Sequence, residues 1–334
     1  MSVLEQFTPD VERYSIDEAF LDISKCRCES YHALGVEIRD RVHLWTGVPV
    51  TVGIATTKTL AKVANHIAKN SEKAAGVLDL TDSPYMDVAL GRTPVEEVWG
   101  IGPTYAKLLR ERGITTVLAL RDVDTRWARA VMTVVGARIV MELRGISCLP
   151  LETCPPPRKS VSCSRSFPVV VNGIDELREA VSVFVTRAAE RLRRHGLAAS
   201  AVTVSIRTSP HGDSAKYDRP ATVEMIYPTD STQELLQSAL EALERVFRKG
   251  YDYRSAGVVL TGLVPADQLT GRLFDSETME RFRRVMPVVD RLNQKFGRDT
   301  VRWGRANPNG RWKTRAARTS PHYTTRLSDV PTLY

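Results

Sequence analysis

The chain has 334 residues, of which 43% are hydrophobic and 26% are charged, and its formal net charge is +8. This composition is ordinary for a globular protein with a real core and excludes a fibrous or wholly disordered chain. No run approaches the roughly 18 apolar residues that span a bilayer. Met1-Ser-Val-Leu-Glu5 also lacks the pattern of a secretory signal. We therefore expect a cytoplasmic protein of two or three domains with no membrane partner.

The net charge rises along the chain. It is −3 for residues 1–92, +1 for 93–157, +3 for 158–264 and +7 for 265–334. This asymmetry suits a polyanionic partner on the C-terminal two-thirds, and a solvated basic tail is the alternative. The five cysteines contain no CxxC pair, so they predict reduced thiols rather than disulfides or a zinc ribbon.

The first segment, residues 1–92, alternates predicted strands and helices. The alternation is typical of an α/β or α+β fold. Thr57 is a predicted helix N-cap, and the dipeptide Asp17-Glu18 lies between the first two strands. The expected elements are strands at 11–16 and 19–23, a helix at 29–46, a strand at 48–54, a helix from 57 to about 70, and a strand at 76–80.

Three further segments follow. Residues 93–157 are predicted to be short helices broken by glycines, ending in the linker-like Pro155-Pro-Pro157. Residues 158–264 predict the order β-α-β-β-α-β, which is the split βαβ arrangement. Residues 265–334 begin with apolar residues at helical spacing, interrupted by Pro287, and are expected to be irregular after Gly297.

The Asp17-Glu18 dipeptide is the strongest candidate for chemistry. Neighbouring residues on a flat strand point to opposite faces, but at a hairpin tip both carboxylates can converge on one site. Paired carboxylates bind Mg²⁺, and two Mg²⁺ ions can activate a 3′-hydroxyl and stabilise a leaving pyrophosphate. Taken alone, an Asp-Glu dipeptide is more often a solvated turn.

Three motifs resolve this choice. They are Tyr14-Ser-Ile-Asp-Glu-Ala-Phe-Leu-Asp-Ile23, Val52-Gly-Ile-Ala-Thr-Thr-Lys-Thr-Leu-Ala-Lys-Val-Ala-Asn65 and Val98-Trp-Gly-Ile-Gly102. Their order and spacing resemble the signatures of Y-family translesion DNA polymerases, and the stretch from Phe296 resembles the UmuC branch. The resemblance implies an α+β multidomain right hand. Residues 1–92 would be the C-terminal part of the palm, 93–157 a thumb with a helix-hairpin-helix, 158–264 the little finger, and 265–334 a clamp-binding-like segment with a basic C-terminal region.

The resemblance also assigns roles at the candidate active site. It implies that Asp17 and Glu18 are catalytic and are two of the three carboxylates that hold two Mg²⁺ ions in the complete family site. Lys69 matches a family lysine that contacts the incoming triphosphate; a solvated lysine at a helix end is the alternative. Lys58 and Lys62 are expected to be structural or to contribute only to the general field around DNA.

Several residues are predicted to bind DNA. Gly100, Ile101 and Gly102, followed by Lys107 and Arg110, resemble a helix-hairpin-helix, whose glycines let backbone N–H groups approach a phosphate. Such contacts read the DNA backbone rather than its sequence.

The little-finger sheet offers a second DNA-binding surface. Arg165 and Arg207 are predicted on strands whose open face would lie on DNA; ordinary exposed arginines are the alternative.

A further segment resembles the family's sliding-clamp peptide. Its residues are Gln268, Leu273 and Phe274, with Gln268 displaced by two positions from the usual spacing. A loop that packs its own Leu and Phe is the alternative. By resemblance the partners are template–primer DNA, damaged DNA, the sliding clamp, the cleaved UmuD dimer and the recombinase filament, in the bacterial cytoplasm at the nucleoid.

The family's palm starts with a strand that carries the first metal aspartate, yet only 16 residues precede Asp17 here. The resemblance therefore implies that this aspartate and the fingers are absent from the chain. Asp10 and Asp22 are not expected to replace it, because an extended strand would put them roughly 23 Å and 16 Å from Asp17.

Two hypotheses remain. The first is error-prone translesion DNA synthesis in the SOS response, with the activity of this chain in doubt because two carboxylates hold Mg²⁺ poorly. The second is a non-catalytic remnant that binds DNA and the clamp. A helix-hairpin-helix nuclease or glycosylase is disfavoured, because nothing supplies its catalytic lysine or acid in context and it leaves the little-finger pattern unexplained.

Overall fold

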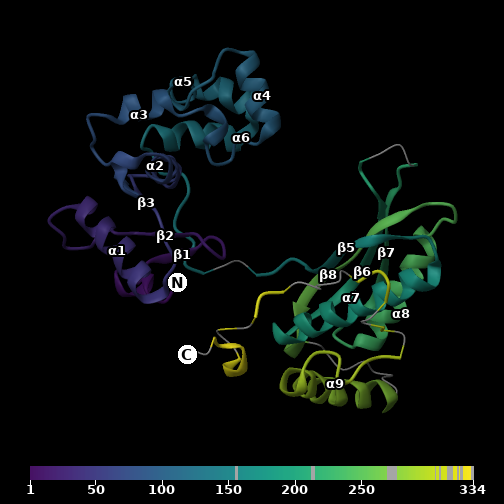
Figure 1. The fold of residues 1–334 in the computed structure, drawn as a ribbon. Coiled ribbons are helices and arrows are strands. Elements are labelled where there is room, and N and C mark those ends of the chain that lie inside the picture. The colour runs from purple at the N-terminus through teal and green to yellow at the C-terminus, as the bar shows by residue number, and fades with distance from the viewer. Residues whose placement is uncertain are drawn as a thin grey trace. The chain divides into compact units, whose positions relative to one another are not determined.

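In a computed structural model the chain folds as two compact units, residues 1–156 (unit 1) and 157–334 (unit 2). Figure 1 shows their elements. The structure describes the whole chain except residues 155–156, 212–214, 269–276, 305, 308–309, 314–318, 322, 324–325 and 332–334, and for residues 277–284 it describes the backbone alone. No helix among the described residues is both long and apolar enough to cross a membrane.

The N-terminal part of unit 1 contains two small sheets. Strands β1 (Val11–Arg13) and β2 (Ala19–Leu21) pair antiparallel, whereas β3 (Val52–Ile54) and β4 (Val77–Asp79) pair parallel. Helices α1 (Tyr31–Thr46) and α2 (Lys58–Asn70) pack beside β3 and β4. Short 3₁₀ turns lie at Leu4–Gln6 and Glu72–Ala74.

The predicted helices of this part are confirmed within two residues at each end. Ser30 caps α1 by accepting a hydrogen bond from the Ala33 amide, and Thr57 caps α2 by accepting one from the Leu60 amide. Position 53 of β3 requires glycine for a steric reason, because an added Cβ would lie 2.2 Å from the Asn65 amide nitrogen of α2. The sequence therefore allows α2 to lie directly on the strand.

The remainder of unit 1 is helical and shares its core with α2. Leu60 and Val63 of α2 pack in the same buried cluster as Leu109, Leu120 and Val140. The elements are α3 (Met86–Arg92), a 3₁₀ turn (Val95–Glu97), α4 (Pro103–Glu111), α5 (Val117–Arg121) and α6 (Thr125–Leu143).

Helix α6 is kinked at Met132 and Thr133 rather than at its glycine. Thr133 has φ of 65° and ψ of −168°, a conformation that costs a β-branched residue about 1–3 kcal/mol. Gly136, which the sequence suggested as a break, lies buried inside the helix. Close packing is the reason, because a Cβ there would lie 2.3 Å from the Cβ of Met132.

Unit 2 is built on a four-stranded antiparallel sheet in the order β5-β8-β6-β7. The elements are β5 (Val161–Val171), α7 (Ile174–Arg194), β6 (Leu197–Thr208), β7 (Asp218–Thr229), α8 (Thr232–Val246) and β8 (Tyr253–Pro265). This confirms the predicted β-α-β-β-α-β order. Three of the four prolines within the sheet, Pro168, Pro220 and Pro228, lie on the edge strands β5 and β7, where a missing N–H is tolerated, and the fourth, Pro265, is the last residue of β8.

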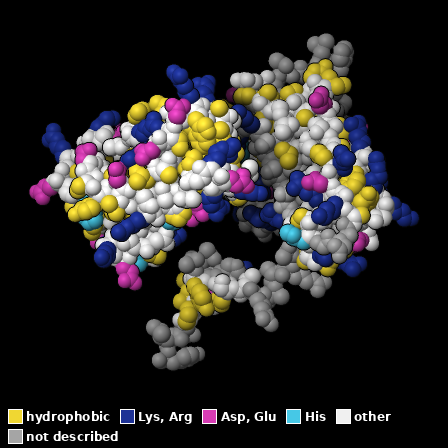
Figure 2. All heavy atoms as spheres, turned by 90° about the horizontal axis from the view of Figure 1, so that it is seen from above, with side chains coloured by type: hydrophobic (Ala, Val, Ile, Leu, Met, Phe, Trp, Pro, Cys, Tyr) yellow, Lys and Arg dark blue, Asp and Glu magenta, His cyan; other side chains and the backbone are white. Residues whose placement is uncertain are grey.

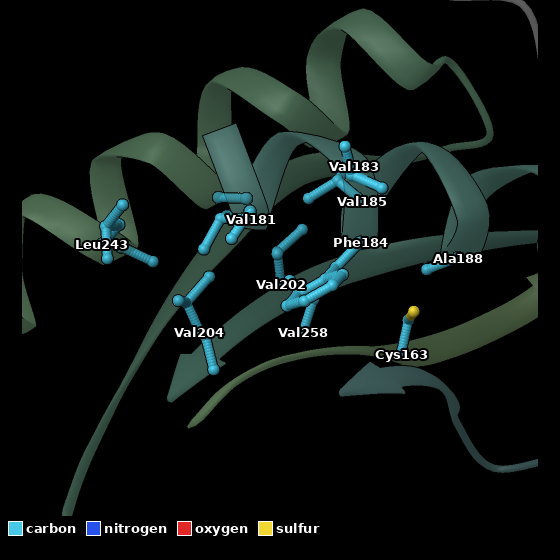
Figure 3. Close-up of a cluster of buried hydrophobic side chains, with 14 of the residues drawn as sticks. Cys163, Val181, Val183, Phe184, Val185, Ala188, Val202, Val204, Leu243 and Val258 are labelled. Carbon is cyan, nitrogen blue, oxygen red and sulfur yellow. The ribbon is translucent and has the colours of Figure 1, made fainter. Parts of the chain in front are cut away.

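Helices α7 and α8 lie on one face of this sheet. Val202, Val204 and Ile206 alternate along β6 and are fully buried beneath α7 and α8. Figure 3 shows Phe184 of α7 pointing into this cluster beside Val202 and Val258. The strict alternation of the strands therefore produces one apolar layer and one open face.

The C-terminal region adds a helix and an irregular segment. Helix α9 (Glu277–Phe296) follows a 3₁₀ turn (Ala266–Gln268), and a further turn lies at Leu327–Asp329. The helix continues through Pro287 instead of being interrupted there. A proline inside a helix removes one backbone hydrogen bond.

Trp312 joins this region to the core of unit 2. Its side chain is 3% exposed and packs edge-on against Phe184 and Phe167, with ring centroids 5.4 and 6.4 Å away. The residues after Gly297 are therefore not simply a solvated basic tail, because one of them completes the apolar core.

Candidate active site

Asp17 and Glu18 lie in the turn between β1 and β2, as the sequence predicted. The strands pair from Val11 opposite Leu21 to Arg13 opposite Ala19, which leaves residues 14–18 outside the ladder. The Ser15 amide closes this turn by donating to the Glu18 carbonyl over 3.0 Å. Both acidic side chains are exposed, so the hairpin presents them to solvent.

Ser15 orients this pair of acids. Its hydroxyl donates to Oδ1 of Asp17 over 2.6 Å and accepts the amides of Asp17 and Glu18 at 3.3 and 3.2 Å. The hydrogen bond from Ser15 is the main reason that the pKa of Asp17 is lowered, and the positive charges of Lys62 and Lys69 add to the effect. Asp17 is thus held as a carboxylate.

Two lysines of α2 accompany the hairpin. Nζ of Lys62 lies 2.7 Å from Oε1 of Glu18 and 5.0 Å from the centre of the Tyr14 ring. Lys69 is exposed in the last turn of the same helix. Lys62 was expected to be structural or to contribute only to the general field, and its ion pair with Glu18 agrees with the structural alternative.

An aromatic cluster supports the base of the hairpin. Tyr14 and Phe20 flank the turn, and both pack against Trp99 with ring centroids 5.4 and 5.7 Å away. Nε1 of Trp99 donates a hydrogen bond of 2.9 Å to the Tyr14 hydroxyl. Trp99 immediately precedes Gly100, so the predicted DNA-binding turn begins directly at the hairpin.

The donor set of the hairpin fits a hard divalent cation. Mg²⁺ in nucleotide-handling sites takes one or two carboxylates, with substrate phosphates and water filling its other positions. Asp17 and Glu18 supply such a pair, although no group of three His, Cys, Asp or Glu that could hold a metal occurs within the described part of the chain. Asp10 and Asp22 lie at the opposite end of the strand pair, where the Asp22 amide donates to the Asp10 carbonyl over 3.0 Å.

The predicted helix-hairpin-helix residues fall at the start of α4. Gly102 is the N-cap, and Gly100 has φ of +93° with Ile139 Cδ1 2.9 Å from any added Cβ, so only glycine fits there. Lys107 and Arg110 are exposed, and they lie 4.0 Å from Glu111 and 3.5 Å from Glu96. The Ile101 side chain is 7% exposed in the core, so its backbone alone is available to a ligand.

The two arginines predicted on the open sheet face lie on opposite faces. Arg207 pairs with Ser255 and Asp218 across the ladder and forms an ion pair with Asp218 at 3.0 Å. Arg165 instead pairs with Ala256, which is buried on the helix-covered side. The expectation of one shared arginine face was wrong because residues 165 and 207 differ in register by one position.

The clamp-like segment is only partly described. Gln268 ends the 3₁₀ turn Ala266–Gln268, whereas Leu273 and Phe274 lie outside the described residues. Its role stays a prediction.

The sequence analysis did not predict three features of the site, which are the contacts of Ser15, Lys62 and Trp99. Ser15 carried a usable signal, because a serine two residues before an aspartate often folds back onto the backbone of a turn. The positions of Lys62 and Trp99 carried no such signal, since they depend on how α2 and the start of α4 pack against the hairpin.

Comparisons with known proteins agree with this architecture. Residues 1–66 match the impB/mucB/samB family, residues 158–273 match the impB/mucB/samB family C-terminal domain, and residues 283–333 match a domain of unknown function, DUF4113. A solved Y-family DNA polymerase chimera of Dbh and Dpo4 shares the fold with a TM-score of 0.60 at 21% identity, covering 79% of this chain and 74% of that one.

Curated relatives are closer in sequence. Protein UmuC of Salmonella typhimurium is 37% identical, covering 99% of this chain and 79% of the relative. Protein SamB of Salmonella typhimurium is 36% identical, over 98% and 78%. DNA polymerase IV of Pelotomaculum thermopropionicum is 30% identical, over 90% and 72%. These matches, together with the hairpin that carries Asp17 and Glu18, show that the chain belongs to the UmuC type of the Y-family DNA polymerases.

Proposed function

We propose that this protein takes part in error-prone translesion DNA synthesis, binding template–primer DNA and adding nucleotides to the primer with Mg²⁺. The observation that carries the proposal is the exposed Asp17–Glu18 hairpin, which keeps one acid ionised and has Lys62 and Lys69 beside it. Family membership supports the same role.

The residues of the hairpin would divide the work. Asp17 and Glu18 provide the carboxylates for Mg²⁺, and the metal, when bound, supplies activation of a 3′-hydroxyl and neutralisation of a leaving pyrophosphate. Ser15 holds the Asp17 carboxylate in a fixed rotamer through the 2.6 Å hydrogen bond. Lys69 is free to meet the triphosphate, because the structure shows it exposed at the end of α2. Lys62 keeps Glu18 in place through their ion pair.

DNA would be held mainly through its phosphates. In unit 1 the backbone of Gly100 to Gly102 and the side chains of Lys107 and Arg110 are the proposed contacts. In unit 2 the proposed phosphate contact on the open face of the sheet is Arg207. Arg165 is exposed on the edge strand β5, and it is proposed to contact phosphate from that edge. Figure 2 shows Lys and Arg side chains spread over both units and mixed with Asp and Glu.

The proposed partners follow the same family. They are damaged template–primer DNA, the sliding clamp through Gln268, Leu273 and Phe274, the cleaved UmuD dimer and the recombinase filament. The proposed location is the bacterial nucleoid, where these partners meet.

Primer extension with Mg²⁺ and deoxynucleoside triphosphates tests the catalytic part of this proposal. The Asp17→Asn variant is expected to lower incorporation by about 10²-fold or more, because a metal-binding charge is lost. Asp22→Asn is the matched control, since Asp22 lies at the other end of the strands and should not affect the rate. Equal rates for Asp17→Asn and the unmutated chain would refute the assignment.

DNA binding is tested separately by titration at several salt concentrations. Lys107→Ala is expected to reduce the slope of log K against log salt by about 1, because one phosphate contact is removed. Lys73→Ala, on an exposed turn of unit 1, is the control. Salt-dependent DNA binding without any incorporation by the unmutated chain would favour the non-catalytic alternative, in which the protein binds DNA and the clamp.

A further inference from the structure

The segment that follows α6, residues 148–152, has no regular secondary structure, but side chains of unit 1 hold its backbone in place. Residues 148–152 follow the end of α6 and contain no helix or strand. Their backbone nevertheless makes four hydrogen bonds to three side chains, those of Glu142, Lys58 and Glu12. We name this set, Glu12, Lys58 and Glu142, the anchor.

Glu142 is the most buried member of the anchor. Its side chain is 0% exposed. Oε1 accepts the amides of Cys148 and Leu149 at 2.6 and 3.1 Å, and Oε2 accepts the amide of Thr59 at 3.1 Å. A buried carboxylate is tolerated only when hydrogen bonds satisfy it, and here three backbone amides do so. One acid therefore fastens the segment to the first turn of α2.

Glu12 and Lys58 fasten the other end of the segment. They form an ion pair whose side chains are 9% and 11% exposed. Nζ of Lys58 also donates to the Pro150 carbonyl over 2.7 Å, and Oε2 of Glu12 accepts the Glu152 amide over 2.7 Å. Glu12 belongs to β1, so the segment is tied to the strand pair that carries the active-site hairpin.

The described residues after this point are exposed. They are Thr153, Cys154 and residues 157–160, and β5 starts at Val161. We name the stretch of sequence between the anchor and β5, residues 153–160, the tether. Without the anchor it would begin after Ile146, whose amide still closes the end of α6 by donating to the Met141 carbonyl.

We propose that Glu12, Lys58 and Glu142 are positioning residues that set the working length of the tether to unit 2. This inference rests on the proposed function, in which both units hold the same DNA. A fully extended tether of residues 153–160 reaches about 28 Å, whereas a released tether of residues 147–160 reaches about 49 Å. The effective concentration of one unit at DNA held by the other falls roughly as the −3/2 power of tether length, so release weakens joint binding about two- to threefold.

Hydrogen exchange of the full chain tests the anchor itself. The Glu142→Gln side chain offers one acceptor oxygen and one NH2 group, so at least one of the three backbone amides then faces an N–H donor. We expect the amides of Cys148, Leu149 and Glu152 to exchange fast in Glu142→Gln and in Lys58→Met. Peptides from α7 should exchange at the wild-type rate. Glu72→Gln and Lys73→Met, on an exposed turn of the same unit, are the matched controls.

DNA affinity tests the consequence for the tether. We expect Lys58→Met and Glu142→Gln to weaken binding of a primer–template long enough for both units by about two- to threefold. A wild-type chain with six Gly and Ser residues inserted after Pro157 should show the same loss while its anchor amides stay protected. This insertion keeps the test valid if either substitution impairs folding.

Each outcome has one meaning. If the insertion leaves DNA affinity unchanged although the wild-type chain binds DNA, tether length does not matter and the inference is wrong. It is equally wrong if the amides of Cys148, Leu149 and Glu152 exchange fast in the wild-type chain. A wild-type chain that binds no DNA refutes the proposed function instead, and the exchange data then still report whether the anchor exists.

Discussion

The two units obtain their order in different ways. Unit 2 encloses one continuous apolar layer between a four-stranded sheet and two helices, so that Phe184, Val202 and Val258 are fully buried (Figure 3). The N-terminal part of unit 1 instead has two separate two-stranded sheets. The irregular segment 148–152, which follows α6, is held by the side chains of Glu12, Lys58 and Glu142. Part of the order of unit 1 therefore depends on charged side chains rather than on an apolar layer.

The units also differ in charge. Residues 1–156 carry a net charge of −2, whereas residues 157–334 carry +10. Long-range attraction to a polyanion therefore resides in unit 2, while the acids needed for a metal lie in unit 1. The following substitutions test how each unit is stabilised and how its titratable groups are held.

The largest expected effect is on the apolar core of unit 2. Phe184→Ala removes a fully buried ring that packs against Trp312, and we expect it to lower the free energy of unfolding by about 3–5 kcal/mol. Chemical denaturation measures this. Ile226→Ala is the control, since that side chain is 90% exposed on β7 and should change stability by less than about 0.5 kcal/mol. Similar values for both would contradict the apolar origin of the order in unit 2.

The second effect is on the polar support of unit 1. Glu142→Ala removes the acceptor of the buried Thr59 amide and of the half-buried Cys148 and Leu149 amides, and we expect a loss of about 3 kcal/mol. Chemical denaturation measures this loss of stability, and hydrogen exchange of peptides from α2 shows where it occurs. Glu72→Ala, at an exposed position, is the control. Faster exchange in α8 rather than in α2 would show that the effect is not local to unit 1.

The third effect is a loss of stability of unit 2 in alkali. Burial raises the pKa of Tyr253, whose hydroxyl donates to the Arg248 carbonyl over 2.8 Å. Because the folded pKa lies above the ordinary value near 10, the stabilisation is complete below pH 10 and is lost as the pH rises further. Tyr253→Phe should cost about 1 kcal/mol at neutral pH and remove this alkaline decline.

Denaturation between pH 8 and about pH 11 separates the loss of the Tyr253 hydrogen bond, which lowers stability at every pH, from the decline in alkali, which depends on the Tyr253 pKa. Tyr323→Phe serves as control because that ring is half exposed, and it should retain the decline of the wild-type protein. An unchanged decline in Tyr253→Phe would show that another group titrates.

The smallest effect is confined to the hairpin. Ser15→Ala should raise the pKa of Asp17 toward its ordinary value of 3.8, since the Ser15 hydrogen bond is the main cause of its lowering. With a lowered folded pKa, whatever stability Asp17 contributes is present above pH 3.8 and is lost as the pH falls. Carboxyl-carbon NMR titration measures the shift. Ser24→Ala is a reciprocal control, because Ser24 lowers the pKa of Asp22 and should leave Asp17 unchanged.

The sequence predicted the fold of unit 2 well, for a physical reason. Residues 202–207 of strand β6 alternate apolar and polar, and the spacing of Leu177, Ala180, Val181 and Phe184 gives α7 one apolar side. Both patterns are local, so they survive without knowledge of the partners. The position of Asp17 and Glu18 in a hairpin was equally local, because two short strands flank them.

The remaining features depend on contacts between distant parts of the chain. Glu142 in the sequence is an ordinary acid near a helix end, and only the approach of Thr59 and Leu149 makes it a buried acceptor. Arg165 and Arg207 were assigned to one face because strand registers cannot be read from either strand alone. Trp312 lies in a segment of no periodicity, so nothing local predicted that it would enter the core.

The position of Trp312 in the sequence also sets a time order on folding. A ribosome delivers the chain from its N-terminus, so all four strands of unit 2 are available once Pro265 has emerged. Phe167 and Phe184 then remain uncovered on one side until residue 312 follows. During synthesis the sheet therefore passes through a stage in which an apolar surface is exposed. At that stage it depends on the rest of its own chain, or on a chaperone, to avoid aggregation.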